Sequence, residues 1–100
     1  MGINVNIPEQ CEVNRPVTMN IQPFGVGCEL VVIVSSTGSD VVGKRWQGWD
    51  GKRPVDFELI PRELGLQYVE VELFHGTSRI GYIIVEAEIR EAEAPGDGGE

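Results

Sequence analysis

Few side chains in this sequence could carry covalent or acid–base chemistry. There is one histidine, His75, and there are two cysteines, Cys11 and Cys28. A thiol nucleophile needs a base such as histidine beside it, and no motif in the sequence brings His75 to either cysteine. His75 stands between polar residues in a predicted turn, where a surface histidine is the simplest interpretation. We therefore expect no enzyme and assign no catalytic residue; the alternative is a small enzyme or a ligand-carrying barrel that uses Cys11 or His75.

The sequence indicates neither a metal site nor a cofactor. One histidine and two separated cysteines are too few for a zinc tetrad without help from carboxylates. The stretch 25–27 is only G-x-G and lacks the rest of a dinucleotide-binding fingerprint. The carboxylate pairs Glu70/Glu72 and Glu86/Glu88 are expected on the polar faces of adjacent strands. A solvated surface explains them better than a glycosidase site, which also needs a cleft.

The segment from Lys44 to Arg53 (KRWQGWDGKR) is the one local anomaly. It carries four basic residues and one acidic residue in a protein of net charge −8, and it holds both tryptophans. Tryptophan and arginine are the residues most enriched in binding hot spots, so the candidate binding residues are Arg45, Trp46, Trp49 and Arg53. The expected partner is a protein or a neighbouring domain of the same chain.

A structural role for this bend competes with the binding role. One tryptophan could plug an open end of the domain while Asp50 and Gly51 turn the chain. Stacking on single-stranded nucleic acid is a third interpretation. Within the bend we expect Trp46 to be the more buried ring and Trp49 the more exposed one, and a buried indole should have its N–H hydrogen-bonded.

The elements that must position these residues are predicted to be short strands. Apolar and polar residues alternate with a period of two, which is typical of a strand with one buried face. The last two strands should form a hairpin around the turn 75–78. The expected strands are 3–7, 17–22, a central strand 28–34, a short one at 41–42, 55–59, 66–74 and 80–89.

Six or seven short strands with Gly and Pro between them predict an all-β fold. We expect an immunoglobulin-like antiparallel β-sandwich of about seven strands, with a small closed barrel as the alternative. The predicted core is the set of inward residues of these strands: Leu30, Val32, Val34, Phe57, Leu59, Val69, Val71, Leu73, Ile83 and Val85.

Length, charge and cysteine use set the remaining expectations. One hundred residues fit one domain, here 1–90, followed by an acidic Gly/Pro linker or tail over 91–100. The acidic balance disfavours nucleic acid as a partner, and the longest apolar run, Leu30–Val34, cannot span a membrane. We expect Cys11 and Cys28 to be free thiols in a reducing, cytoplasmic compartment.

From Trp46 onward the pattern resembles a known kind of module. The residues that carry the resemblance are Trp46-x-Gly48, Val55-x-Phe57-x-Leu59, Pro61, Gly65, Val69, Val71 and Ile80-Gly81. They are similar to small β-sandwich modules of bacterial multidomain effectors, which sit beside caspase-like (CHAT) or Toll/interleukin-receptor-like (TIR) domains in signalling and defence proteins. The resemblance implies a non-catalytic, cytoplasmic accessory domain.

A second resemblance is to the filamin-type immunoglobulin-like repeat. Asp50-Gly51, the step from Pro61 to Gly65, and Gly76 are similar to its final three strands. That family's Ser-Pro-Phe before the last strand is absent, and Ile80-Gly81-Tyr82 stands in its place. The second resemblance implies the same sandwich architecture.

Overall fold

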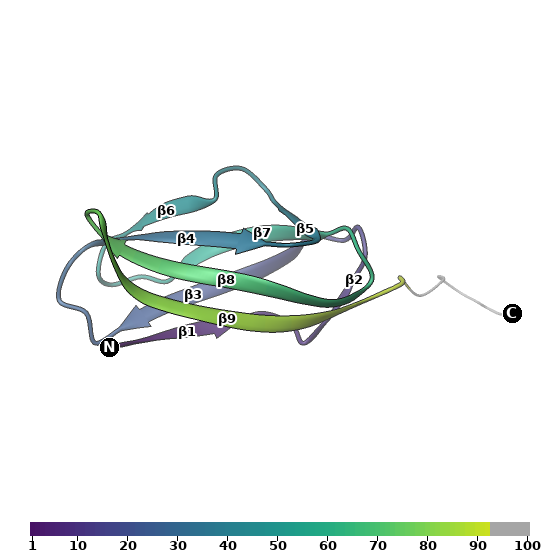
Figure 1. Ribbon diagram of the computed structural model, residues 1–100, viewed down its shortest axis with the longest axis horizontal. Helices are drawn as coiled ribbons and strands as arrows, with labels where there is room; N and C mark the ends of the chain where they lie inside the picture. Colours follow the sequence, from purple (N-terminus) through teal and green to yellow (C-terminus); the bar gives the residue numbers. More distant parts are fainter. Residues whose placement is uncertain (93–100) are drawn as a thin grey trace, which may run out of the picture.

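The computed structural model describes residues 1–92, and within that range the chain forms strands and connecting turns with no helix. Two sheets pack against each other around one main core (Figure 1). The all-β class and the sandwich arrangement are thereby confirmed. The strands are β1 (Gly2–Asn6), β2 (Gln10–Glu12), β3 (Val17–Phe24), β4 (Leu30–Ser36), β5 (Ser39–Val41), β6 (Trp46–Trp49), β7 (Val55–Pro61), β8 (Gly65–His75) and β9 (Ser78–Arg90).

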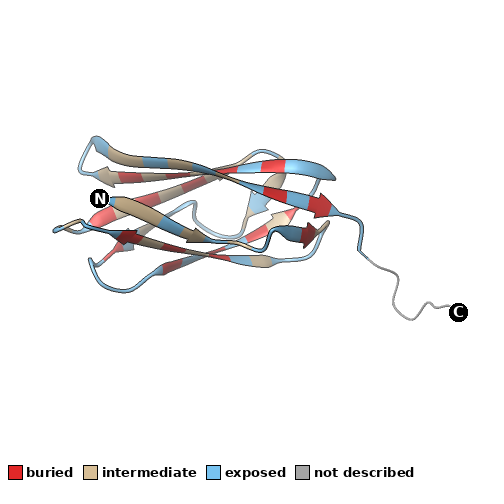
Figure 2. Ribbon diagram, turned by 90° about the horizontal axis from the view of Figure 1, so that it is seen from below, coloured by how far each residue is buried: buried red, intermediate tan, exposed pale blue. Residues whose placement is uncertain are grey.

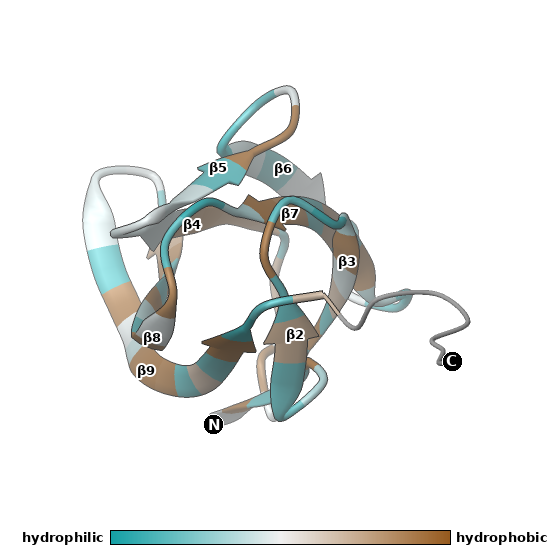
Figure 3. Cartoon of the chain, turned by 90° about the vertical axis from the view of Figure 1, so that its right-hand side faces the viewer, coloured by the Kyte–Doolittle hydropathy of each residue, from teal (hydrophilic) through white to brown (hydrophobic). Residues whose placement is uncertain are grey.

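The four-stranded sheet has the order β1-β3-β7-β5, and the five-stranded sheet has the order β2-β9-β8-β4-β6. The five-stranded sheet is strongly curled when the molecule is seen end-on (Figure 3). Neighbouring strands are antiparallel with one exception: β2 pairs with β9 in parallel. The chain changes sheets between Asn6 and Gln10 without reversing its direction, so β2 runs along β9 (Figure 1). The predicted purely antiparallel pairing is wrong at this edge.

The core holds most of the predicted residues. Leu30, Val32, Val34, Phe57, Leu59, Val69, Val71 and Leu73 are all buried. The prediction is wrong for Ile83 and Val85, which are only partly buried. Ile83 lines a hollow of about 270 Å³ together with Ile3 and Gly81, and this hollow leaves part of its side chain exposed. Met19, Ile21 and Trp49 are also in the core, although they were not among the predicted core residues.

Two prolines that were expected to stop strands lie inside them. Pro23 belongs to β3 and pairs with Ile3, and Pro61 belongs to β7 and pairs with Ser39. Each proline lies near the end of its strand, where that strand has a partner on one side only. A proline, which has no backbone N–H to donate, is tolerated at such a position in a sheet.

The β8–β9 hairpin is the longest pairing and carries the surface described below. His75 pairs with Ser78 across a two-residue turn, as predicted, and Gly76 has a φ of 62° there. More buried and more exposed residues alternate along most of both strands (Figure 2). Gly81 lets β9 approach Leu73 closely, because a Cβ at that position would lie 3.0 Å from Cδ1 of Leu73.

The predicted C-terminal linker, residues 91–100, is only partly described. Residues 91 and 92 are exposed and outside any strand, and the rest of the predicted linker, residues 93–100, lies outside the described residues. Within residues 1–92 no helix is long and apolar enough to cross a membrane.

Candidate functional site

The predicted bend at 44–53 contains a strand, and this strand places the two tryptophans on opposite faces. β6 pairs with β4, so Trp49 lies opposite buried Leu30 and Trp46 lies opposite Ile33. Trp46 is 50% exposed and Trp49 is 3% exposed, the reverse of the predicted order. The reason is the strand period of two: residues three positions apart in a strand point to opposite faces. A bend has no such rule, and β6 was not predicted.

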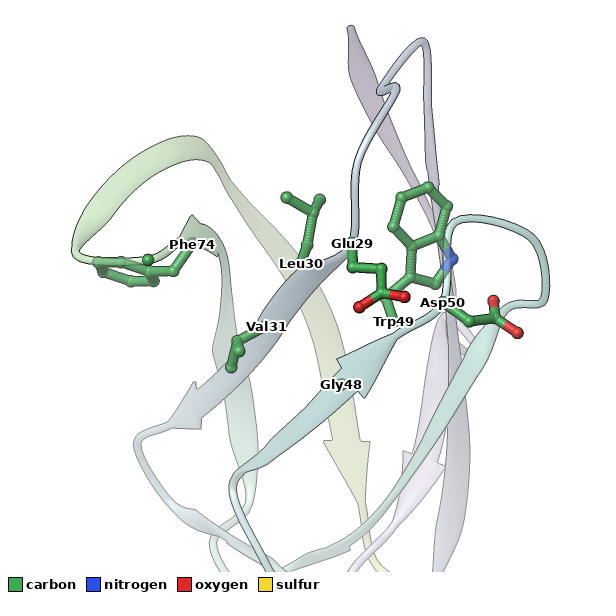
Figure 4. Close-up of a pocket in the computed structure, with 8 residues that line it drawn as sticks. Glu29, Leu30, Val31, Gly48, Trp49, Asp50 and Phe74 are labelled. Carbon is green, nitrogen blue, oxygen red and sulfur yellow. The ribbon is translucent and has the colours of Figure 1, made fainter.

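Trp49 is a core residue and is excluded as a contact residue. Its indole Nε1 is buried without a hydrogen-bond partner among residues 1–92, although a buried indole was expected to have one. In Figure 4 this nitrogen points away from Phe74.

The structural role predicted for Asp50-Gly51 is confirmed. The Asp50 carboxylate accepts hydrogen bonds from the backbone N–H groups of Lys52 (2.8 Å) and Arg53 (3.0 Å), and Gly51 has a φ of 88°.

The four predicted binding residues do not form one site. Arg45 and Trp46 lie at the start of β6, where the Lys44 ammonium stands 4.9 Å from the centroid of the Trp46 ring. Arg53 follows the other end of β6 and contacts the Asp50 carboxylate at 3.5 Å. Of the predicted set, only Arg45 and Trp46 remain together at the surface.

Trp46 belongs to a larger surface that the sequence analysis missed, the outer face of the five-stranded sheet. Five of its large side chains, including Trp46, Tyr82 and Ile84, are between 43% and 53% exposed. We call this surface the aromatic face. Its outward residues are Val31 and Ile33 of β4, Trp46 of β6, Leu66, Tyr68, Glu70, Glu72 and Phe74 of β8, and Tyr82, Ile84, Glu86 and Glu88 of β9.

Charged groups connect the middle of the aromatic face. The Tyr82 hydroxyl donates to Glu70 Oε1 at 2.8 Å, and this bond to a carboxylate raises the pKa of Tyr82. Arg79 Nη1 donates to Glu72 Oε2 at 3.2 Å, and the same guanidinium lies 4.6 Å from the centroid of the Tyr82 ring. The two carboxylates expected to be merely solvated, Glu70 and Glu72, therefore hold aromatic and basic neighbours in place.

The outer face of the four-stranded sheet has a different composition. Polar residues stand opposite each other across its strands, as Asn4 does with Gln22 and Asn20 with Asp56. Asn20 Nδ2 donates to Asp56 Oδ1 at 2.8 Å. Glu58 and Thr18 continue this polar surface. One outer sheet face is thus mainly polar, with exposed Phe24 at the end of β3, and the other exposes several large apolar side chains.

A hollow of about 470 Å³ opens at one end of the aromatic face (Figure 4). Its floor includes Val31 and Phe74, and Glu29 stands at its rim. A Cβ at Gly48 or at Gly76 would meet no atom within 4 Å, so these two glycines leave the space open.

Cys11 and His75, two of the residues considered for nucleophilic chemistry, lie far apart. Cys11 pairs with Ile89 and His75 pairs with Ser78, eleven positions away along β9, which places them about 35 Å apart. Cys11 is buried and its thiol donates to the Pro8 carbonyl at 3.5 Å, and burial raises the pKa of that thiol. A cysteine–histidine pair is therefore excluded for Cys11. Both cysteines are free, as predicted.

No group of three or more potential metal ligands occurs within the described range 1–92.

The comparison with known proteins adds no family: no protein-family model matches the sequence, and no curated protein matches it either. The candidate site therefore rests on the geometry of the aromatic face.

Proposed function

We propose that this domain is a non-catalytic protein-binding or domain-tethering module and that the aromatic face is its contact surface. The observation that carries the proposal is the difference between the two outer sheet faces. Trp46, Tyr68 and Tyr82 gather on one of them, while polar pairs cover most of the other, whose one exposed aromatic among residues 1–92 is Phe24 at the end of β3. Contiguous exposed apolar surface on a small protein is typical of an interaction site.

The composition of the face supports a protein rather than a nucleic acid as partner. Tyrosine and tryptophan are enriched in protein interfaces, because they bury a large area with few rotatable bonds. The carboxylates Glu70, Glu72 and Glu86 among them would repel a phosphate backbone. The separation of Cys11 from His75 supports the binding role over an enzyme that pairs these two residues.

We further propose that the sandwich is immunoglobulin-like. The order β1-β3-β7-β5 opposite β9-β8-β4 corresponds to the order ABED opposite GFC of that fold. The edge strand β6 departs from that order. It follows β5 in the chain, yet it belongs to the other sheet, where it pairs with β4. The resemblance to modules beside caspase-like and TIR domains supports a place in a bacterial signalling or defence protein, in the cytoplasm.

Site-specific photo-crosslinking tests the proposed contact surface. A benzophenone side chain is placed at Ile84, at the centre of the aromatic face, or at Thr18, on the polar face, in the full-length protein in its own cells. We expect a discrete crosslinked protein or domain from position 84 and none from position 18. Equal crosslinking from both positions, or none from position 84, would overturn the proposal.

A further inference from the structure

Two tyrosines of the aromatic face each stand opposite a glutamate across β8 and β9. Tyr82 is opposite Glu72, and Tyr68 is opposite Glu86. The Cβ atoms of directly opposite residues in an antiparallel pair lie about 5 Å apart. Each pair therefore places an aromatic ring and a carboxylate within reach of the same incoming side chain.

The first pair already binds a cation that belongs to the protein. The Arg79 guanidinium lies 4.6 Å from the centroid of the Tyr82 ring and donates to Glu72 at 3.2 Å. Arginine suits this arrangement, because its flat guanidinium can stack on a ring and hydrogen-bond to a carboxylate at once. The Tyr82–Glu72 pair is thus an internal example of how this surface binds an arginine.

The second pair has the same two groups and no such cation. Among residues 1–92, no lysine or arginine lies over the Tyr68 ring or forms an ion pair with Glu86. Tyr68 is 46% exposed. Arg90, the next basic residue along β9, contacts Glu88 instead at 3.2 Å. A hollow of about 240 Å³ adjoins the pair, and it is lined by Glu9, Leu66, Glu86, Ala87 and Glu88.

We propose that the Tyr68–Glu86 pair binds an arginine side chain from a basic segment of the partner protein. The proposal rests on the proposed function and names the chemistry of its partner. Local charge selects this occupant. On the aromatic face Glu72 and Glu88 are paired with Arg79 and Arg90, and Glu70 accepts the Tyr82 hydroxyl, whereas Glu86 forms no ion pair among residues 1–92. A second copy is disfavoured because the two chains would each carry a net charge of −8.

A synthetic peptide in which arginine and valine alternate is the probe. Amide NMR signals of the whole protein are followed as this peptide is added, at physiological salt. We expect shifts centred on residues 66–70 and 84–88. The Glu86→Gln and Tyr68→Leu variants should each bind the peptide about fivefold more weakly. A peptide with citrulline in place of arginine keeps the shape and loses the charge, and it should not bind.

The matched control is Glu58→Gln, which removes the same charge from an exposed position on the polar face. If Glu58→Gln weakens binding as much as Glu86→Gln does, the attraction is general electrostatics and the proposal is wrong. The Arg79→Gln variant frees the Tyr82–Glu72 pair, so peptide should then also shift the signals of those two residues. Unchanged signals there would contradict the proposed mode. Self-association through the aromatic face, detected as concentration-dependent shifts without peptide, would replace the basic partner with a second copy.

Failure here and failure of the proposed function give different results. Crosslinking from position 84 without binding of the arginine peptide would keep the contact surface and reject its arginine chemistry. Peptide binding at Tyr68 and Glu86 without any crosslinked protein from position 84 would keep the chemistry and reject the protein-binding role.

Discussion

At the scale of single residues, the two tryptophans of β6 have separate tasks, and substitution distinguishes them. Trp49→Ala should lower the free energy of unfolding by about 3–5 kcal/mol, because it leaves a cavity in the core. Trp49→Phe should cost only about 1–2 kcal/mol, since the lost indole N–H has no partner to leave unpaired. Trp46→Ala should change stability by less than about 0.5 kcal/mol. Urea unfolding of the three variants checks this order, and a Trp46→Ala variant as unstable as Trp49→Ala would contradict it.

Asp50 gives the turn after β6 a dependence on pH. Hydrogen bonds from the backbone N–H groups of Arg53 and Lys52 lower the pKa of Asp50 below its ordinary value of 3.8. A lowered pKa in the folded state stabilises the fold at pH values above 3.8, and this contribution is lost as the pH falls through the folded-state pKa. Asp50→Asn keeps a side-chain oxygen but not the charge. Its melting temperature should therefore lie below that of the wild type at pH 7 and approach it below about pH 4.

Asp50→Ala is the control for this titration. It removes the acceptor as well as the charge, so its melting temperature should stay below that of the wild type in acid too. A constant difference between wild type and Asp50→Asn across the pH range would show that the charge does not matter.

At the scale of elements, Gln47 joins the two sheets at the β6 edge. Its side-chain Nε2 donates to the Asp56 carbonyl of β7. Along β7, the Glu58 carbonyl accepts a hydrogen bond from the Val42 N–H at 2.9 Å, and Asp56 lies beyond the end of β5. Beyond the end of β5, the Gln47 side chain thus supplies the hydrogen bond to β7. This bond holds β6, the edge strand that carries Trp46.

Gln47→Leu should therefore loosen β6. We expect the variant to lose about 0.5–1.5 kcal/mol of unfolding free energy, the usual value of one hydrogen bond. The Val34 amide, which donates to the Arg45 carbonyl at 2.8 Å, should exchange its hydrogen faster. The control is Gln22→Leu, because the Gln22 side chain donates to the carbonyl of its own neighbour Pro23 and joins no strands. Equal effects of both substitutions on Val34 would contradict the role of Gln47.

At the scale of the whole molecule, the two thiols mark opposite ends of the sandwich. Cys11 pairs with Ile89 near the end of β9, and Cys28 precedes β4 at the end where the β8–β9 turn lies (Figure 1). Both thiols should react with a thiol reagent in unfolded, unreduced protein. In the folded protein Cys28 should react faster, because Cys11 is 4% exposed and its pKa is raised. Equal rates in the folded protein would show that the β2 edge opens readily.

The sequence by itself determined the elements whose side chains alternate over many residues. The long alternating runs of β8 and β9 placed Val69, Val71 and Leu73 inside and Glu70, Glu72 and Glu86 outside, because a period of two leaves one choice of buried face. The all-β class followed from the same pattern. The strands β2 and β6 are three and four residues long, too short for a period to be recognised, so the surface tryptophan of β6 was assigned wrongly.

Only the tertiary structure decided which exposed residues share a surface. Trp46, Ile33, Glu72 and Tyr82 come from four strands and lie in one row because of the pairing register. Register joins residues that are distant in the chain, and no local pattern records it. Likewise, Tyr68 and Glu86 were each identifiable as outward-facing from the sequence. Their position opposite each other, and that of Arg79 over Tyr82, depends on how β8 and β9 pair.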